Sequence, residues 1–230
     1  GIATTIYGGN MNVSPGTSIT GAVQPDSPGS RQNSADFAAS VLAAHAEAMG
    51  VDENVTPIPI EIGGETFTPG TYSSGSAINF ASGTTVTLDG DGKYLFIADT
   101  TLVTAADTYF ILINGARAEN VLWAINTIFT VGAGSYFKGS IMAGSVTFDA
   151  NVVLYGSILA QTAVTLGAQN EVYGCVVALT AITFGTANFV AFVQAVDSAP
   201  EAIPAVLTAD FPSLGADVND DFIIACMPLT

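Results

Sequence analysis

Positive charge is almost absent from this chain of 230 residues, which has 4 Lys and Arg against 20 Asp and Glu. The formal net charge at neutral pH is therefore −16. Clustered cations are what hold nucleic acid or an anionic lipid surface, so this balance argues against both kinds of partner. Mutual repulsion between such acidic molecules favours a soluble protein, and we expect a monomer with no nucleic-acid and no membrane partner.

Long apolar runs are also missing, although 49% of the residues are hydrophobic and the mean hydropathy is +0.49. No run approaches the ~20 residues that a membrane-spanning helix needs. The apolar residues instead form short runs that Gly, Ser, Thr and Asn interrupt. This pattern is typical of many short buried strands.

Cysteine and catalytic clusters are scarce. The two cysteines, Cys175 and Cys226, belong to no CxxC motif and to no Cys/His cluster. They could form a disulfide in an oxidising compartment or remain two separate thiols, and the sequence leaves both open. We predict no catalytic residue, no metal and no cofactor.

One helix is expected, over residues 33–50. Asn33 or Ser34 can cap its start, and Gly50 can end it. Phe37 and Val41 fall on one apolar face with Ala44 and Ala48 at helical spacing. His45 lies off that stripe, which predicts an ordinary histidine on the helix surface.

Almost everything else is strand-like and repeats one tetrad: a small residue or Thr, a variable residue, an apolar residue, then Thr or Asn. The copies occupy 17–20, 76–79, 101–104, 127–130, 144–147, 162–165 and 180–183. From 79 onward, the fourth positions are separated by 25, 26, 17, 18 and 18 residues. A period near 18 residues indicates a solenoid with one coil per repeat.

Side-chain direction follows from the two-residue period of a strand. The apolar third position should point inward at Ile19, Ile78, Val103, Phe129, Val146, Val164 and Ile182. The fourth position should then point outward at Thr20, Asn79, Thr104, Thr130, Thr147, Thr165 and Thr183. The second position should also point outward, and we expect Leu102 and Ile128 to protrude there while Gly144 leaves a gap in the first column.

Two further strands complete each coil. One is apolar throughout, as in Ile158–Ala160, and must be buried on both faces. The other carries bulky outward groups such as Lys138, Tyr155 and Tyr173. We therefore predict an all-β solenoid, a β-helix with three faces: one under the 33–50 helix, one bulky and one rich in Thr.

At this point the sequence resembles a known family. The motifs NVSPGTSITG, TFTPGTYSSGSAINF, LINGARAENVLWAI, FKGSIMAGSVTF and YGSILAQTAVTLGA, in this order, are similar to those of the microbial ice-binding proteins with a discontinuous right-handed β-solenoid. The likeness runs from Thr5 to Phe192. The chain departs from the family at Ala118, where relatives often carry Cys, and in the acidic tail after Val193.

The resemblance implies a secreted antifreeze protein of one domain, 1–230, whose partner is the ice surface. Its parts would be an N-terminal coil and loop (1–32), the helix (33–50), main coils (60–192) and a C-terminal cap (193–230). The N-terminal coil would be inserted between the last two coils, so that Ile19 touches Val164 and Ile182. The implied ice-binding residues are Thr17, Ser18, Thr20, Ala77, Asn79, Thr101, Thr104, Thr127, Thr130, Ser145, Thr147, Thr162, Ala163, Thr165, Thr180, Ala181 and Thr183.

Two other classes share this fold. A polysaccharide-acting β-helix enzyme needs carboxylates clustered with Arg, Lys or His, whereas here Arg31, Lys93, Arg117, Lys138 and His45 belong to different segments. A secreted adhesin or structural solenoid module could present the same Thr-rich face to a polymer or a cell. An ice-affinity partition test distinguishes the adhesin from the ice-binding protein.

Overall fold

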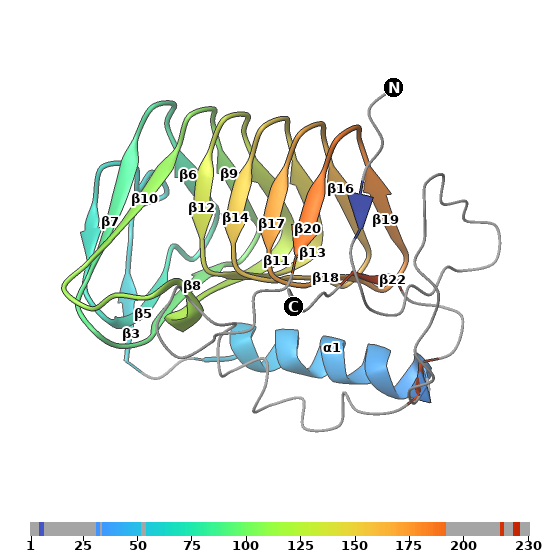
Figure 1. Cartoon of the computed structure of the whole chain (residues 1–230). Helices are drawn as coiled ribbons and strands as arrows, with labels where there is room; N and C mark the ends of the chain where they lie inside the picture. Colours follow the sequence, from blue (N-terminus) through green and yellow to red (C-terminus); the bar gives the residue numbers. More distant parts are fainter. Residues whose placement is uncertain are drawn as a thin grey trace.

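The computed structural model describes residues 34–51 and 54–191, together with short strands at 5–6, 31–32, 217–218 and 223–225. Side chains are described for residues 42–51 and 54–190. The strands stack as successive coils of a β-solenoid, with the helix along one side (Figure 1). The period of the tetrads had predicted this architecture.

One long sheet forms the bulky face. All of its pairs are parallel, and it has eight strands. In stacking order they are β4 (Thr66–Phe67), β7 (Thr85–Asp89), β10 (Tyr109–Ile113), β12 (Tyr136–Lys138), β14 (Val153–Tyr155), β17 (Glu171–Tyr173), β20 (Phe189–Ala191) and β1 (Thr5–Ile6).

A twelve-stranded sheet forms the other two faces, because β11 (Val121–Val131) and β13 (Ser140–Phe148) continue around the corner between them. The row beside the helix adds β3 (Val55–Pro57), β5 (Gly70–Ser73), β8 (Tyr94–Ala98), β15 (Ile158–Ala160), β18 (Val176–Ala178) and β22 (Ile223–Ala225). The remaining row adds β6 (Ile78–Phe80), β9 (Thr101–Thr104), β16 (Ala163–Leu166) and β19 (Ala181–Phe184).

The core lies inside the coils and is aromatic toward the β4 end. Trp123 is fully buried there. Its ring stacks on Phe96 at 4.2 Å between centroids, and Phe137 lies 5.1 Å away. In the later coils branched aliphatic residues such as Leu154 and Val172 fill the same space. This change in side-chain size accompanies the shortening of the repeat to about 18 residues.

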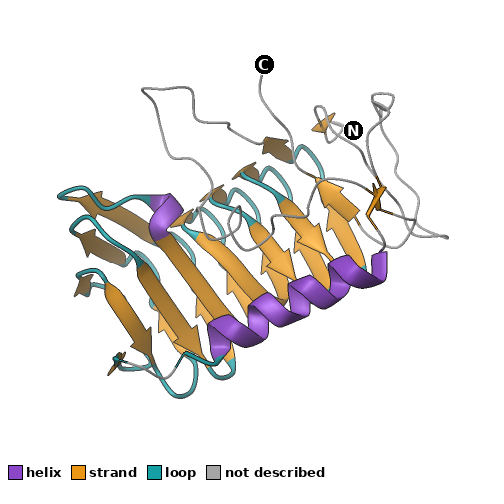
Figure 2. Cartoon of the chain, turned by 90° about the horizontal axis from the view of Figure 1, so that it is seen from below, coloured by secondary structure: helices purple, strands orange, loops and turns teal. Residues whose placement is uncertain are grey.

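The helix α1 (Ser34–Met49) runs along the stack, across the strands of one face (Figure 2). A second apolar cluster joins them and includes Ala48 of the helix with Ile97, Met142 and Leu159 of the sheet. The prediction that the helix covers the all-apolar strands is confirmed. Among the described residues, no helix has the length and hydropathy needed to cross a membrane.

The interpretation of His45 as a surface residue is wrong. The side chain is only 4% exposed and lies between α1 and the sheet. Its Nε2 is 2.9 Å from the Ile125 carbonyl oxygen, and its Nδ1 is 2.6 Å from Nε2 of Gln161. His45 therefore gives the helix a polar anchor on two coils, beside the apolar contacts of Ala48.

Leu159 tests this interface, because it is 6% exposed beneath the helix. Leu159→Tyr should lower the free energy of unfolding by about 1–3 kcal/mol, since the larger ring overpacks the contact. Urea denaturation measures the change. Tyr155→Leu, on the bulky face, is the control and should cost less, and equal costs would contradict the placement of the helix.

The chain order is discontinuous. β1 pairs with β20 at one end of the stack, whereas β3, the first strand after the helix, lies at the other end. However, the expected insertion of an N-terminal coil between the last coils is wrong for the described strands. Val164 pairs directly with Ile182 across β16 and β19, which leaves no space between them, and β1 extends the stack beyond β20. Ile19 itself lies outside the described residues.

The C-terminal region returns to the solenoid. β22 pairs antiparallel with β18 and adds a strand to the helix-facing row, while β21 (Asp217–Val218) pairs with β2 (Arg31–Gln32). Cys175, just before β18, is disulfide-bonded. Because the chain has two cysteines, its partner is Cys226, which lies outside the described residues. Of the two alternatives that the sequence left open, the disulfide is the one found.

Candidate functional site

The row formed by β6, β9, β11, β13, β16 and β19 carries most of the repeated Thr residues, and we call it the threonine face. Its strands pair in parallel, so equivalent residues of successive coils lie side by side. The outermost register, the fourth column, consists of Asn79, Val103, Thr130, Thr147, Thr165 and Thr183.

Five of these six residues were predicted to occupy this column. The inward third position is also as expected at Ile78, Phe129, Val146, Val164 and Ile182, all of which are buried. Thr165 and Thr183 are exposed, whereas Thr130 and Thr147 are partly exposed. The predicted residues Thr17, Ser18 and Thr20 lie outside the described residues.

The tetrad 101–104 is in the opposite register to the one predicted. Leu102 is fully buried and Val103 is 41% exposed, so neither the inward Val103 nor the protruding Leu102 is found. Thr104 is 2% exposed, and its Oγ1 accepts a hydrogen bond of 2.9 Å from the Gly132 amide. Thr104 is therefore a corner residue and not part of the outward column.

The physical reason for this shift is the size of the side chain that fills the core. Leu102 pairs with Ile78 on one side and with Phe129 on the other, and it fills their layer better than Val103 would. Two Thr residues, Thr100 and Thr101, precede it, so the tetrad fits the sequence in either frame. The greater volume of Leu is the signal that separates the two frames.

The first column consists of Ser76, Thr100, Thr127, Gly144, Thr162 and Thr180, which are linked from coil to coil by backbone hydrogen bonds. Two of its hydroxyls are used within the protein. Thr127 Oγ1 donates to the Thr100 carbonyl at 2.6 Å, and Thr162 Oγ1 donates to the Gly144 carbonyl at 2.7 Å. The corresponding hydrogens are not available to an outside ligand.

The fourth column differs in this respect. None of the hydroxyls of Thr130, Thr147, Thr165 and Thr183 is hydrogen-bonded to another described residue. Each presents a methyl group and a free hydroxyl on a β-branched side chain with restricted χ1. The fourth column can therefore bind and order water, whereas the first column helps to hold the coils together.

Small residues separate these two columns over most of the face. The middle column consists of Ala77, Thr101, Ile128, Ser145, Ala163 and Ala181, as the register of the neighbouring pairs requires. Ile128 is 45% exposed, as predicted from its position in the tetrad. Thr101 thus belongs to the middle column and not to the first.

Gly144 leaves the expected gap in the first column, and the structure explains it. A Cβ atom at this position would collide with the Thr127 carbonyl oxygen and would lie 3.1 Å from that of Asn126. Neither atom can move without breaking the strand. Backbone crowding, and not surface function, therefore selects glycine here.

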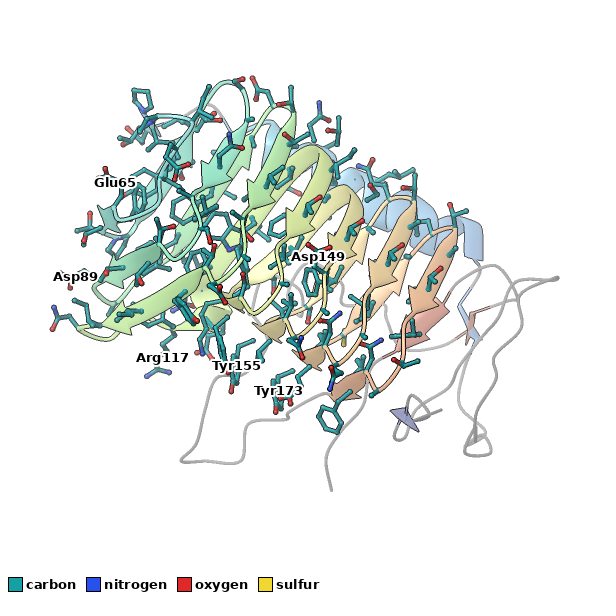
Figure 3. The ribbon with its side chains drawn as sticks, turned by 90° about the horizontal axis from the view of Figure 1, so that it is seen from above. Glu65, Asp89, Arg117, Asp149, Tyr155 and Tyr173 are labelled. Atoms are coloured by element: carbon teal, nitrogen blue, oxygen red, sulfur yellow. The ribbon has the colours of Figure 1, made fainter. Side chains whose placement is uncertain are left out.

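The bulky face is aromatic and partly charged. Tyr155 and Tyr173 project on the same side from neighbouring coils (Figure 3), with ring centroids 4.8 Å apart. Lys138 Nζ lies 3.6 Å from the centre of the Tyr155 ring. Burial, and then the hydrogen bond and charge of Glu171, raise the pKa of Tyr173 to about 12. The phenol therefore stays neutral and donates to the Glu171 carboxylate at 2.8 Å.

Acid–base and metal-ligating groups are dispersed over the described part of the chain. Glu65 and Asp89 lie at the end of the stack formed by the first coils, whereas Tyr173 belongs to the last ones (Figure 3). The guanidinium of Arg117 lies 3.4 Å from Glu119 on the same short segment. Among the described residues, His, Cys, Asp and Glu nowhere form a group of three that could hold a metal ion.

Comparison with known proteins identifies the family. The family model described as ice-binding-like matches residues 1–170, which is most of the 230-residue chain. The chain belongs to the ice-binding-like family. This agrees with the resemblance found in the sequence motifs and with the stacked coils.

Curated relatives of this ice-binding-like chain come from several kinds of organism. An ice-binding protein of Nostoc sp. (strain HG1) is 32% identical over 165 residues, which cover 66% of this chain and 59% of the relative. One of Flavobacterium frigoris (strain PS1) is 31% identical over 104 residues, covering 45% of this chain and 38% of the relative. The chain thus spans about two fifths to three fifths of the length of these relatives.

Solved structures of the ice-binding-like family share the fold. The ice-binding protein of the Antarctic ascomycete Antarctomyces psychrotrophicus has a TM-score of 0.54 at 31% identity, with 59% of this chain and 68% of that chain covered. A glycosylated ice-binding protein from an Arctic yeast has a TM-score of 0.53 at 26% identity, with 72% and 65% covered.

Proposed function

We propose that this protein is an antifreeze protein that adsorbs to ice through its threonine face and inhibits ice growth and recrystallisation. The observation that carries the proposal is the fourth column, in which the Thr side chains of β11, β13, β16 and β19 lie in register with hydroxyls that no described residue engages. The ice-binding relatives support it.

The geometry of the face suits a crystalline ligand. Neighbouring strands lie ~4.8 Å apart, and alternate residues along a strand lie ~6.6–7 Å apart, so outward side chains form a grid comparable to repeats of the ice lattice. The methyl groups exclude water, while the hydroxyls hold it in fixed positions. Stiff χ1 angles reduce the entropy that binding would otherwise cost.

We further propose that the protein is a secreted, monomeric binding protein without enzymatic activity. The disulfide at Cys175 supports an oxidising compartment outside the cytosol. The dispersed charged groups of the described residues support a surface that binds and does not catalyse. Neither nucleic acid nor membrane is a proposed partner, because the net charge is −16.

The test is a thermal-hysteresis measurement combined with ice-affinity partition. Purified protein should concentrate in the ice fraction and should lower the freezing point below the melting point. If the protein stays wholly in the liquid fraction, ice binding is wrong and a structural or adhesive solenoid becomes the better reading.

The strength of the activity is a separate prediction. The protruding Ile128 and the gap at Gly144 make the face less regular than an unbroken Thr ladder. We therefore expect moderate hysteresis with strong inhibition of recrystallisation. Crystal growth observed under a microscope at low micromolar protein measures both, and hyperactive growth without bipyramidal shaping would contradict the prediction.

A further inference from the structure

The threonine face changes character between β11 and β13. On β13, β16 and β19 the middle column contains only Ser145, Ala163 and Ala181, beside a fourth column made wholly of Thr. On the other side of this boundary, Ile128 is 45% exposed and Val103 is 41% exposed. The two halves of the face therefore present different surfaces to solvent.

A β-bulge lies at the same boundary. Ile125 pairs with Ala143 and Ile128 with Ser145, so two residues of β11 stand opposite the single Gly144 of β13. An extra residue in one strand bends it and increases the local twist. The bulge therefore turns the outward residues of β11 relative to those of β13, β16 and β19.

We infer that ice contact is confined to the plane of β13, β16 and β19 among the described strands, and that Ile128 is the ridge that limits it. This inference rests on the proposed function. An Ile side chain reaches two carbon atoms beyond Cβ, whereas Ala ends at Cβ and Ser ends one atom beyond it. A rigid crystal that lies flat on the Ala and Ser side chains cannot also cross the ridge.

The residues beyond the ridge fit this assignment. Val103 replaces the hydroxyl of the fourth column with a methyl group, and Asn79 replaces the β-branched side chain with an amide. Neither repeats the methyl-plus-hydroxyl unit of Thr147, Thr165 and Thr183. Ile128 is therefore a residue that determines the extent of the site, although it is not itself a contact.

Two matched tyrosine substitutions and one substitution of the ridge test the inference. Asn79→Tyr should keep nearly all of the thermal hysteresis, because its column position lies beyond the ridge. Thr165→Tyr should remove most of it. Ile128→Ser should raise hysteresis about twofold, because flattening the ridge brings Thr130 and Thr101 into the contact. Thermal melts verify that each variant is folded.

The outcomes separate the inference from the proposed function. If Asn79→Tyr loses as much activity as Thr165→Tyr, or if Ile128→Ser lowers hysteresis, the contact extends over the ridge and the inference is wrong, while ice binding by the threonine face still stands. If Thr165→Tyr keeps full hysteresis in a protein that binds ice, the face itself is wrong, and the inference is overturned with it.

Discussion

Thr165→Tyr, and equally Thr183→Tyr, is expected to abolish most of the thermal hysteresis while the protein remains folded. Both side chains are exposed, and the core residues Val164 and Ile182 beside them are untouched. Exposed substitutions usually change stability by no more than about 0.5 kcal/mol. The phenol ring would stand off the flat face and hold the crystal away from the neighbouring Thr residues.

Hysteresis measured by nanolitre osmometry, with a thermal melt of each variant, provides the readout. The control is Tyr173→Ala on the bulky face, which removes a ring stacked on Tyr155 and should leave hysteresis nearly unchanged. The opposite result, in which Thr165→Tyr stays fully active and Tyr173→Ala does not, would mean that ice contacts the bulky face.

Trp123→Ala is expected to have the largest effect on stability. The indole is fully buried, stacks on Phe96 and lies 5.5 Å from the Phe110 ring, and its Nε1 donates to the Lys138 carbonyl at 2.9 Å. Replacing a buried Trp by Ala costs about 3–5 kcal/mol, because apolar burial is lost and a cavity remains. The free energy of unfolding in guanidinium chloride measures this loss.

Tyr136→Ala is the matched control for this substitution. Its ring is 48% exposed and stacks on Tyr109 with centroids 5.7 Å apart. Loss of such an exposed pair should cost about 1 kcal/mol or less. Equal losses for the two variants would show that the aromatic cluster around Trp123 does not stabilise the solenoid.

The architecture could be read from the sequence because it repeats. Seven tetrads at a nearly constant period predict stacked coils, and all-apolar runs such as Ile158–Ala160 predict strands covered on both sides. The alternation of directions along a strand then assigns Thr147, Thr165 and Thr183 to the surface without any coordinates. Wherever the repeat is regular, local pattern and tertiary position agree.

Prediction failed where local pattern allowed two answers. The run 100–104 fits the tetrad in two frames, and only packing against Ile78 and Phe129 selects Leu102 as the inward residue. His45 lies off the apolar stripe of its helix, yet two polar groups of the sheet, from Ile125 and Gln161, meet it there. Both choices depend on neighbours distant in sequence, which helical or strand periodicity cannot reveal.

The sequence by itself determined the solenoid, the single covering helix and the Thr-rich face, because each is a periodic property of side-chain size and polarity. Only the tertiary structure decided the shape of that face. The bulge opposite Gly144, the exposure of Val103 and the choice of hydroxyls that stay free in the fourth column all follow from coil-to-coil register. Register is set by contacts between strands roughly one coil apart, and a one-residue shift there exchanges inward and outward side chains.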